Sequence, residues 1–382
     1  MTTLDELAPY AEAWDRLSAG IPFRSWTWMS TWWRHYGDEQ NGRNRRTRLH
    51  VLAVFDRADM LVGVAPWYLD VSAAQGRVLR FLGSGEVCSD HLSLLCPAGL
   101  EERVTEALAG WLTGQRSEDS CGRQPDRWDL VELTGVDADD PNIAQLLEQL
   151  EHRGNTVHRR PGPNCWQIEL PPDWDDYLAR LSKSHRKQLR RLDRDMLSTG
   201  RAVFHTVERI DQLPQAMDML IDLHQRRHRS QGEPGCFASS RFTGFHREVA
   251  GQLLSGGHLQ LHWLELDGKP AAAEYQLAGN GAVYAYQSGI EPEMTDLEPG
   301  RLITLATIRR AVRQGYRAFD FLRGDEPYKP HWRAVPQASQ EIRVVPNRTV
   351  AQLRHGLWRT GSGARQWIRD GLKRVAERGE SR

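Results

Sequence analysis

The most regular alternation of apolar and polar residues lies between residues 258 and 290. Three β-rich runs occur there, at 258–266, 271–279 and 282–290. They are joined at Asp267-Gly268 and Asn280-Gly281. Both dipeptides favour the positive φ angles that two-residue hairpin turns need. The pattern therefore predicts a three-stranded antiparallel meander.

A helix and a further strand follow this meander. The helical period starts at Pro299 and stops at Gly315, and the apolar run 317–322 then predicts a buried strand. The same order recurs earlier, between residues 48 and 135, without letter-by-letter similarity. The earlier series consists of the expected strands RLHVLAVFD, MLVGVAPWYLD, RVLRFLG, HLSLLC and WDLVELTG, with a helix at 99–113 before the last. The chain is thus predicted to be α/β, with two similar modules in tandem.

Three other segments complete the predicted organisation. Residues 173–254, after the proline-rich break PGPNCWQIELPP, have mainly helical spacing and include an expected helix at 178–196. Four tryptophans in SWTWMSTWWRHY, residues 25–36, are expected to pack a helix against the core. The basic, amphipathic end of the chain is expected to dock as a helix rather than bind a membrane. The predicted divisions are a first module at 1–160, a second at 161–346 that includes the helical region, and a tail at 347–382.

Composition and charge exclude several classes of protein. With 382 residues the chain suits two domains. Lys plus Arg and Asp plus Glu number 50 each, so no global field draws the protein to DNA. The five cysteines are scattered and lack CxxC spacing, which indicates neither a disulfide framework nor a zinc site. No stretch is apolar enough for a signal peptide or a membrane span, so a cytoplasmic protein is expected.

The segment FDFLRGDEPYKPHW, residues 319–332, places charge directly after a buried strand. Gly324 permits a sharp exit from the sheet, and Pro327 stiffens the chain that follows. The residue pattern alone is compatible with a polar surface loop in which Lys329 pairs with Asp325 or Glu326, worth about 0 to 1 kcal/mol. From the spacing alone this surface loop is favoured, and the rim of a site is the alternative.

A resemblance favours the site. The run GIEPEMTDLEPGRLITLATIRRAVRQGYRAFDFLRGDEPYKPHW resembles the signature of the CelD/BcsL-type acetyltransferases, a cellulose-biosynthesis-associated family with the GNAT fold. The matching positions are Gly289, Pro299, Gly300, Gly315, Asp320 to Leu322, Gly324 to Lys329, and Trp332. The segments LSKSHRKQLRRLDRDMLSTG and LHQRRHRSQGEPGCF also resemble that family, and together these parts cover about half of the chain. The layout of two modules is similar to that of Fem-type transferases, which pair two GNAT modules.

The resemblance implies where an acyl donor would bind. In GNAT proteins the donor lies between two splayed strands, here 282–290 and 317–322, with its pyrophosphate at the start of the next helix. Gly300 and Arg301 are therefore expected to contact acyl-CoA, as is Tyr286, because helix N-termini and guanidinium groups favour anions. This loop departs from the usual Q/R-x-x-G-x-G/A pattern of GNAT proteins.

Other residues are candidates for contacts with the acceptor. The expected helix 178–196 carries a basic face, from which Arg186 and Arg190 are candidates for substrate phosphates; the alternative is a solvated face. His185, on its apolar stripe, is expected in the core. The resemblance adds Tyr328 and Trp332 as substrate contacts.

The candidate catalytic groups are a histidine, three carboxylates and a lysine. His224 is a candidate base, whereas a metal site with His228 is not expected because the Glu of HExxH is missing. Glu274, on the middle strand of the meander, would face either water or the acyl site. Asp325 or Glu326 is assigned to acceptor positioning or proton removal, and Lys329 to an anionic group of donor or acceptor.

The expected function is transfer of an acyl group, with acetyl favoured, from acyl-CoA to an amine or hydroxyl of a small or nucleotide-linked acceptor such as a sugar or envelope precursor. A Fem-like transferase that uses aminoacyl-tRNA is one alternative, with tRNA the less favoured partner. A non-catalytic module that retains the GNAT fold is the other. No metal is expected.

Overall fold

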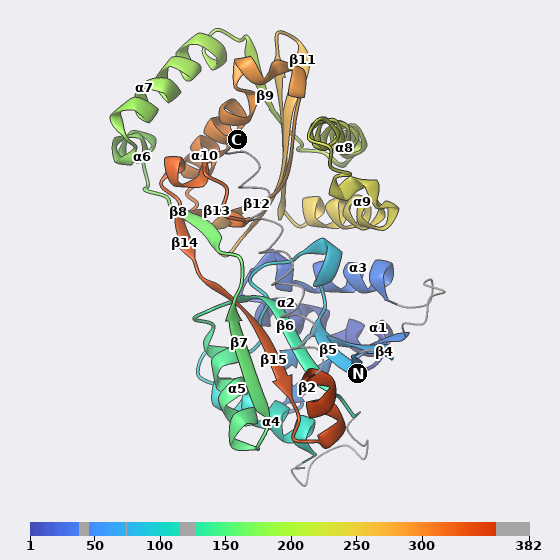
Figure 1. Ribbon diagram of the computed structural model, residues 1–382. Helices are drawn as coiled ribbons and strands as arrows, with labels where there is room; N and C mark the ends of the chain where they lie inside the picture. Colours follow the sequence, from blue (N-terminus) through green and yellow to red (C-terminus); the bar gives the residue numbers. More distant parts are fainter. Residues whose placement is uncertain (38–45, 74, 115–126, 357–382) are drawn as a thin grey trace, which may run out of the picture.

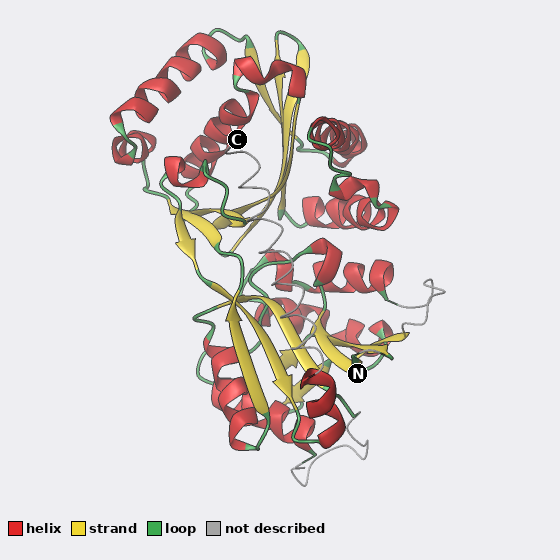
Figure 2. Ribbon diagram, viewed as in Figure 1, coloured by secondary structure: helices red, strands yellow, loops and turns green. Residues whose placement is uncertain are grey.

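A computed structural model describes residues 1–37, 46–73, 75–114 and 127–356 of the chain. It contains two lobes, each built around its own mixed sheet, and the lobes lie one above the other (Figure 1). Both lobes contain helices as well as strands (Figure 2). The predicted α/β class with two GNAT-like modules is confirmed.

The first lobe contains a six-stranded sheet with the order β1-β4-β5-β6-β15-β7. Its strands are β1 (Arg46–Leu49), β4 (Trp67–Ser72), β5 (Gly76–Phe81), β6 (Leu130–Asp137), β7 (Thr156–Pro161) and β15 (Ser339–Val345). Neighbouring strands are antiparallel except for the parallel pair β5 and β6. The expected strands RLHVLAVFD and MLVGVAPWYLD contain β2 (Leu52–Phe55) and β3 (Leu61–Ala65), which pair as a separate two-stranded antiparallel sheet. The helices are α1 (Leu4–Leu7), α2 (Ala11–Leu17), α3 (Trp26–Tyr36), α4 (Glu101–Thr113) and α5 (Pro141–His152).

One expected strand of this lobe is absent. The segment HLSLLC, residues 91–96, makes only an isolated bridge from Leu95 to Val64, and the Leu92 amide donates to the Gly135 carbonyl. His91 has a positive φ of 56°, which takes the backbone out of the extended region. The prediction of a strand was therefore wrong: the apolar residues are buried, but the backbone crosses between elements instead of joining a sheet.

The second lobe contains a seven-stranded sheet with the order β14-β8-β13-β12-β11-β10-β9. Its strands are β8 (Cys165–Glu169), β9 (Ala202–Thr206), β10 (Leu259–Leu266), β11 (Lys269–Gly279), β12 (Ala282–Ile290), β13 (Ala318–Arg323) and β14 (Val335–Gln337). The predicted meander is confirmed as β10 to β12, and both residues of each Asp-Gly and Asn-Gly turn have positive φ. Strands β12 and β13 run parallel.

Helices cover both faces of the second sheet. On one face lie α8 (Leu213–Ser230) and α9 (Ser240–Ser255), and on the other lie α6 (Trp174–Arg180), α7 (Lys183–Leu192) and α10 (Pro299–Arg313) (Figure 1). The single helix expected at 178–196 is broken, because Leu181 is extended and Ser182 caps α7 by accepting from the His185 amide. Strand β9 was not expected inside the helical region, and it pairs with the edge of the meander at β10.

One strand crosses between the lobes. Strand β15, from the end of the described chain, lies between β6 and β7 of the first sheet, whereas the strands of the second sheet, β8 to β14, all come from residues 165–337. The two crossing connections also bond to each other, since the Gly162 amide donates to the Ser339 carbonyl at 2.9 Å. The placing of 339–345 in the second module is therefore corrected, because β15 pairs with β6 and β7 of the first sheet, whereas the boundary after residue 160 falls at the end of β7 (Thr156–Pro161).

The tryptophans of α3 connect the lobes, as expected for a packing role. Trp28 and Trp32 are buried, and the Trp28 ring lies edge-on to Phe245 of α9 at 5.0 Å between centroids. A single apolar cluster contains residues of both lobes. Most of the predicted docking tail, residues 357–382, lies outside the described residues; a helix begins at Thr349.

Candidate active site

The strands β12 and β13 separate in the middle of the second sheet. They pair only from Ala282 to Tyr284 with Ala318 to Asp320. Directly after this pairing, β12 contains a bulge, because Ala285 and Gln287 oppose successive residues of β11 and Tyr286 is skipped. The parting strands leave backbone and side chains facing an open space, at the position that the resemblance implied.

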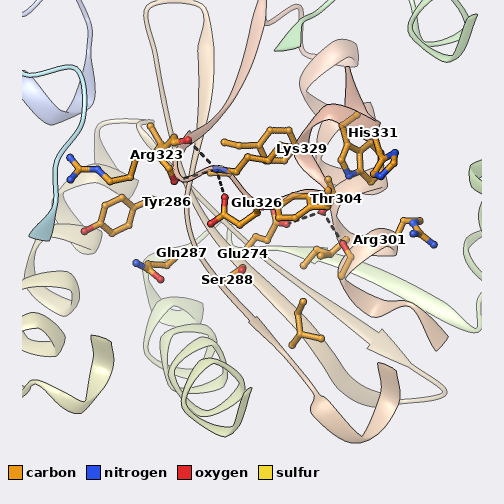
Figure 3. A pocket seen from close by; sticks show the side chains of 18 of the residues that line it. Glu274, Tyr286, Gln287, Ser288, Arg301, Thr304, Arg323, Glu326, Lys329 and His331 are labelled. Atoms are coloured by element: carbon orange, nitrogen blue, oxygen red, sulfur yellow. Dashed lines mark hydrogen bonds and ion pairs between the residues drawn. The ribbon is translucent and has the colours of Figure 1, made fainter. Parts of the chain in front are cut away.

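A cavity of about 860 Å³ occupies this space. Figure 3 shows that side chains of β11, β12, α10 and the segment after β13 converge on it. On one side it is lined from α7 and α10 by Ser182, Ser184, His185, Gln188, Gly300, Arg301, Ile303 and Thr304. On the other side it is lined from α8, α9, the turn between them and the first lobe by Arg227, Cys236, Phe242, Glu86, Val87, Cys88 and Asp90. The cavity can therefore admit one reactant from each face of the sheet.

The chain leaves β13 through two unusual backbone conformations. Leu322 has φ of 56°, and its amide donates to the Oδ1 of buried Asp320 at 2.7 Å. Gly324 has φ of 117°, and a Cβ there would lie 2.6 Å from Glu326 Oε1. The predicted sharp exit at Gly324 thus requires glycine for both reasons.

Lys329 holds this exit in place. Its side chain is 2% exposed, and Nζ donates to the carbonyls of Leu322, Arg323 and Gly324 at 3.1, 3.2 and 2.9 Å. Nζ also lies 2.8 Å from Glu326 Oε2. An ammonium group has three N–H donors, so these acceptors occupy all of them. Lys329 lines the cavity, but its geometry is that of a residue that positions the rim rather than of one that awaits an anion.

The three candidate carboxylates lie in different surroundings. Glu274 is buried in the cavity wall, where burial raises its pKa to about 7 against hydrogen bonds from Gln276, Thr307 and Thr304. Exposure to water was one of the two expectations for Glu274, and the structure corrects it. Glu326 lines the cavity with a half-exposed side chain.

Asp325 is not part of the cavity lining. Its Oδ1 accepts from Trp166 Nε1 at 2.9 Å and from Asn164 Nδ2 at 3.1 Å, and these bonds lower its pKa. Asp325 therefore anchors the segment to β8, away from the reacting groups.

The start of α10 is arranged differently from a free anion site. A Cβ on Gly300 would lie 2.7 Å from the Ile290 Cδ1, so this glycine allows close packing against β12. The Arg301 guanidinium pairs with Glu298, whose carboxylate also lies 3.2 Å from Arg191 Nη2. An incoming phosphate would therefore compete with Glu298 for Arg301.

His224 does not line the cavity. It is buried behind β12, its Nε2 lies 3.4 Å from Cys236 Sγ, and burial, with the charge of His228, lowers its pKa to about 4. Among the described residues, no group of three or more His, Cys, Asp or Glu side chains is placed to hold a metal ion.

The remaining candidates divide between wall and surface. Tyr286 lines the cavity and donates to the Val87 carbonyl of the first lobe at 2.5 Å. Tyr328 and Trp332 also line it, with Tyr328 half exposed and Trp332 buried. Arg186 and Arg190 lie on α7 away from the lining face. His185 is buried as expected, with Nδ1 2.7 Å from the His331 carbonyl.

The first lobe contributes residues that the sequence did not indicate. Arg323 pairs with Asp90 at 2.6 Å and donates to the Ser89 carbonyl at 2.9 Å. Beside this pair, His91 lies between Asp137 of β6 at 2.9 Å and Asp320 of β13 at 3.2 Å. Burial opposes charge on His91, but the two hydrogen bonds outweigh it and raise its pKa to about 10. Loop 83–91 carries no motif, so no signal in the sequence shows that it closes the site of the other lobe.

Comparisons with known proteins agree with this architecture. Residues 183–330 match the family model described as the acetyltransferase (GNAT) domain. A crystal structure of FemX is similar over 90% of this chain and 98% of that chain, with a TM-score of 0.60 and 11% identity. The C-terminal domain of an Agrobacterium fabrum protein assigned as a lysylphosphatidylglycerol synthetase is similar over 91% of this chain and 94% of that chain, with a TM-score of 0.51 and 10% identity. No curated protein matches the chain.

These comparisons do not single out the CelD/BcsL-type family, which stays a prediction. In the part of the chain that the structure describes, no helix is both long and apolar enough to cross a membrane. Residues 183–330 thus match a GNAT acetyltransferase domain, and the fold of the two lobes together is similar to that of FemX.

Proposed function

We propose that the protein transfers an acyl group from acyl-CoA to an amine or hydroxyl of a small acceptor. One observation carries the proposal: a cavity passes between the parted strands β12 and β13, and a carboxyl group with a pKa of about 7 lies in its wall. The match of residues 183–330 to a GNAT acetyltransferase domain supports the same reaction.

The donor would enter from the side of α7 and α10. Ile303, Ala285 and Phe321 offer apolar contacts for the thioester arm, so this part of acyl-CoA fits the residues present. The diphosphate fits only if it displaces Glu298 from Arg301 or binds beside that pair. The acceptor would enter from the side of α8, α9 and loop 83–91.

In this proposal Glu274 acts as the general base. A base is most effective when its pKa lies near the working pH, which burial achieves for Glu274. Its carboxylate accepts the proton of the attacking amine or hydroxyl, and a bond forms from that atom to the acyl carbon. The carbon–sulfur bond breaks, and CoA leaves as a thiolate that takes up a proton from solvent. Glu326, which lines the cavity beside Lys329, positions the acceptor, while Lys329 and Asp325 hold the rim.

A Fem-like reaction with aminoacyl-tRNA is the second candidate. Two observations favour it: Arg301 is already paired with Glu298, and α7 presents Lys183, Arg186, Lys187 and Arg190 away from the cavity, where they can meet a polyanion. In that reaction Arg186 and Arg190 would contact phosphates of the donor RNA.

A binding and turnover panel distinguishes the candidates. We expect acetyl-CoA or a longer acyl-CoA to raise the melting temperature, since a ligand at 100 times its Kd adds about 2.7 kcal/mol to the free energy of unfolding. Stabilisation by aminoacyl-tRNA and not by CoA thioesters would favour the second candidate. Binding of a donor without transfer to any member of a panel of amines, amino sugars and nucleotide sugars would favour a non-catalytic module.

A further inference from the structure

Arg227 is an unpaired cation in the wall of the cavity. It belongs to α8 and lines the side that faces the first lobe. The neighbouring charged groups on α8 are committed elsewhere, because Arg226 pairs with Asp222 and Glu291, and His228 pairs with Glu233. Among the described residues, Arg227 has no hydrogen bond or ion pair from its guanidinium group.

The other charged side chains of the cavity are engaged. Asp90 pairs with Arg323, Arg301 with Glu298, and Glu326 with Lys329. Glu86 accepts from the Tyr36 hydroxyl at 2.8 Å, and Glu274 accepts from Gln276. Among the residues that the structure describes, Arg227 is therefore the charged side chain of the cavity wall that has no hydrogen-bond or ion-pair partner.

The charge of Arg227 changes the pKa of two neighbouring groups. Burial lowers the pKa of His224, and Arg227 lowers it further. Burial and the charges of Glu326 and Glu274 raise the pKa of the Tyr328 hydroxyl, and Arg227 opposes that rise. The guanidinium group thus lies within electrostatic range of Tyr328 in the rim segment and of buried His224, and it comes from the face of the sheet opposite α10.

A guanidinium in such a place favours one class of ligand. It is partly removed from water, which costs free energy unless an anion compensates. Its planar donors match the two oxygens of a carboxylate or a phosphate, and the bond is stronger than one between neutral groups. Because the donor would enter from the other face, the group opposite Arg227 belongs to the acceptor.

We propose that Arg227 binds an oxyanion, a carboxylate or a phosphate, of the acceptor, so that the acceptor is an anionic small molecule whose amine or hydroxyl reaches the parted strands. The statement that the bound molecule is the acceptor rests on the proposed function, but the test of this inference measures binding alone. Paired compounds that differ by the oxyanion identify which of the two groups is recognised.

The experiment is calorimetric titration at constant ionic strength with three pairs: phosphoethanolamine and ethanolamine, glucosamine 6-phosphate and glucosamine, alanine and alaninamide. Arg227→Met removes the charge and keeps the length of the side chain. Arg227→Lys keeps a charge without the planar fork. The matched control is Arg229→Met, since Arg229 is exposed on the same helix and does not line the cavity.

We expect the anionic member of at least one pair to bind the wild type at least tenfold more tightly than its partner. Arg227→Met should lose that tenfold preference, which corresponds to about 1.4 kcal/mol. Arg227→Lys should keep part of it, and Arg229→Met all of it. Selectivity for the first two pairs indicates a phosphate, and for the third a carboxylate.

Three outcomes overturn the proposal: the wild type binds no anionic member, Arg227→Met and Arg229→Met lose the same affinity, or the loss in Arg227→Met falls on CoA thioesters. Selective binding of the anion without any acyl transfer would leave this proposal standing and overturn the proposed function instead.

Discussion

Glu274 combines burial with a place in the wall of a cavity, and its pKa of about 7 follows from both. We expect Glu274→Gln to lower kcat by at least a hundredfold, since general base catalysis contributes typically 10²–10⁴-fold. The wild-type kcat should rise with pH through about 7, and the variant should lack this limb. A variant that keeps the limb would assign the base to another residue.

The same carboxyl group makes stability depend on pH. Its pKa in the folded protein lies above its ordinary value of 4.5, so the folded state binds the proton more tightly. The resulting stabilisation is complete below pH 4.5 and is lost as the pH rises through 7. We therefore expect the difference in free energy of unfolding, Glu274→Gln minus wild type, to increase by up to about 3 kcal/mol between pH 4.5 and 8. Urea unfolding across that range measures the difference, and a constant difference would contradict it.

Lys329 is expected to matter for stability as much as for turnover. Lys329→Met leaves three carbonyls and the Glu326 carboxylate without their shared donor, which should cost about 2 to 4 kcal/mol. Lys269→Met is the control, because Lys269 is exposed beside a hairpin turn. Equal melting temperatures for both variants would rule out the positioning role. The sequence could place Lys329 at the rim, but no spacing rule reveals that its partners are backbone carbonyls.

Elements whose local chemistry determines their backbone were predicted well. Asp-Gly and Asn-Gly have few alternatives to a hairpin turn, so the meander from β10 to β12 could be read directly. The prediction of a strand at HLSLLC was wrong because its apolar residues are buried without pairing in a sheet. The break at Leu181 was missed because the apolar stripe continues across it, while the cap at Ser182 is visible only in the hydrogen bonds.

Substitution of Gly324 tests whether the exit of the chain from β13 needs glycine. An alanine at this position would have to adopt a φ of 117°, and its Cβ would lie 2.6 Å from Glu326 Oε1. Gly324→Ala should therefore lose about 1 to 3 kcal/mol of stability. Gly251→Ala is the matched control: it lies in α9, where a Cβ would have ordinary contacts and alanine favours the helix. Denaturant melts of both variants would show the contrast, and a stable Gly324→Ala would remove the argument from strain.

The crossing of β15 and the shared apolar cluster make the two lobes one folding unit. Calorimetry should show a single unfolding transition, because the first sheet is completed by a strand that follows the second lobe in the chain and one apolar cluster contains residues of both lobes. Limited proteolysis should not release two stable halves by cleavage between 161 and 172. Two separate transitions would contradict this view. The placing of β15 in the first sheet could not be predicted, because its apolar pattern is the same whichever sheet it joins.

We expect the charged imidazole of His91, which lies between the lobes, to stabilise their contact less at high pH. The pKa of His91 is raised to about 10, so its stabilisation is complete below pH 6.5 and is lost as the pH rises through 10. We expect His91→Asn, which tolerates the positive φ, to cost about 3 to 5 kcal/mol at pH 6.5 and much less at pH 10.5. Urea unfolding at the two pH values gives the difference, and a cost independent of pH would assign His91 a neutral role.

Strand order also has a consequence for synthesis on the ribosome. Strand β7 ends at Pro161, whereas β15, which must lie between β6 and β7, begins at Ser339. At about 5 to 20 residues per second, roughly 10 to 35 seconds pass before the missing strand emerges. During that time the nascent chain carries β6 with one edge open, a target for chaperones or for the same edge of a neighbouring chain. A gene fragment that ends before residue 339 should therefore give insoluble product, and a separately supplied peptide of residues 339–345 should be the strand that it lacks.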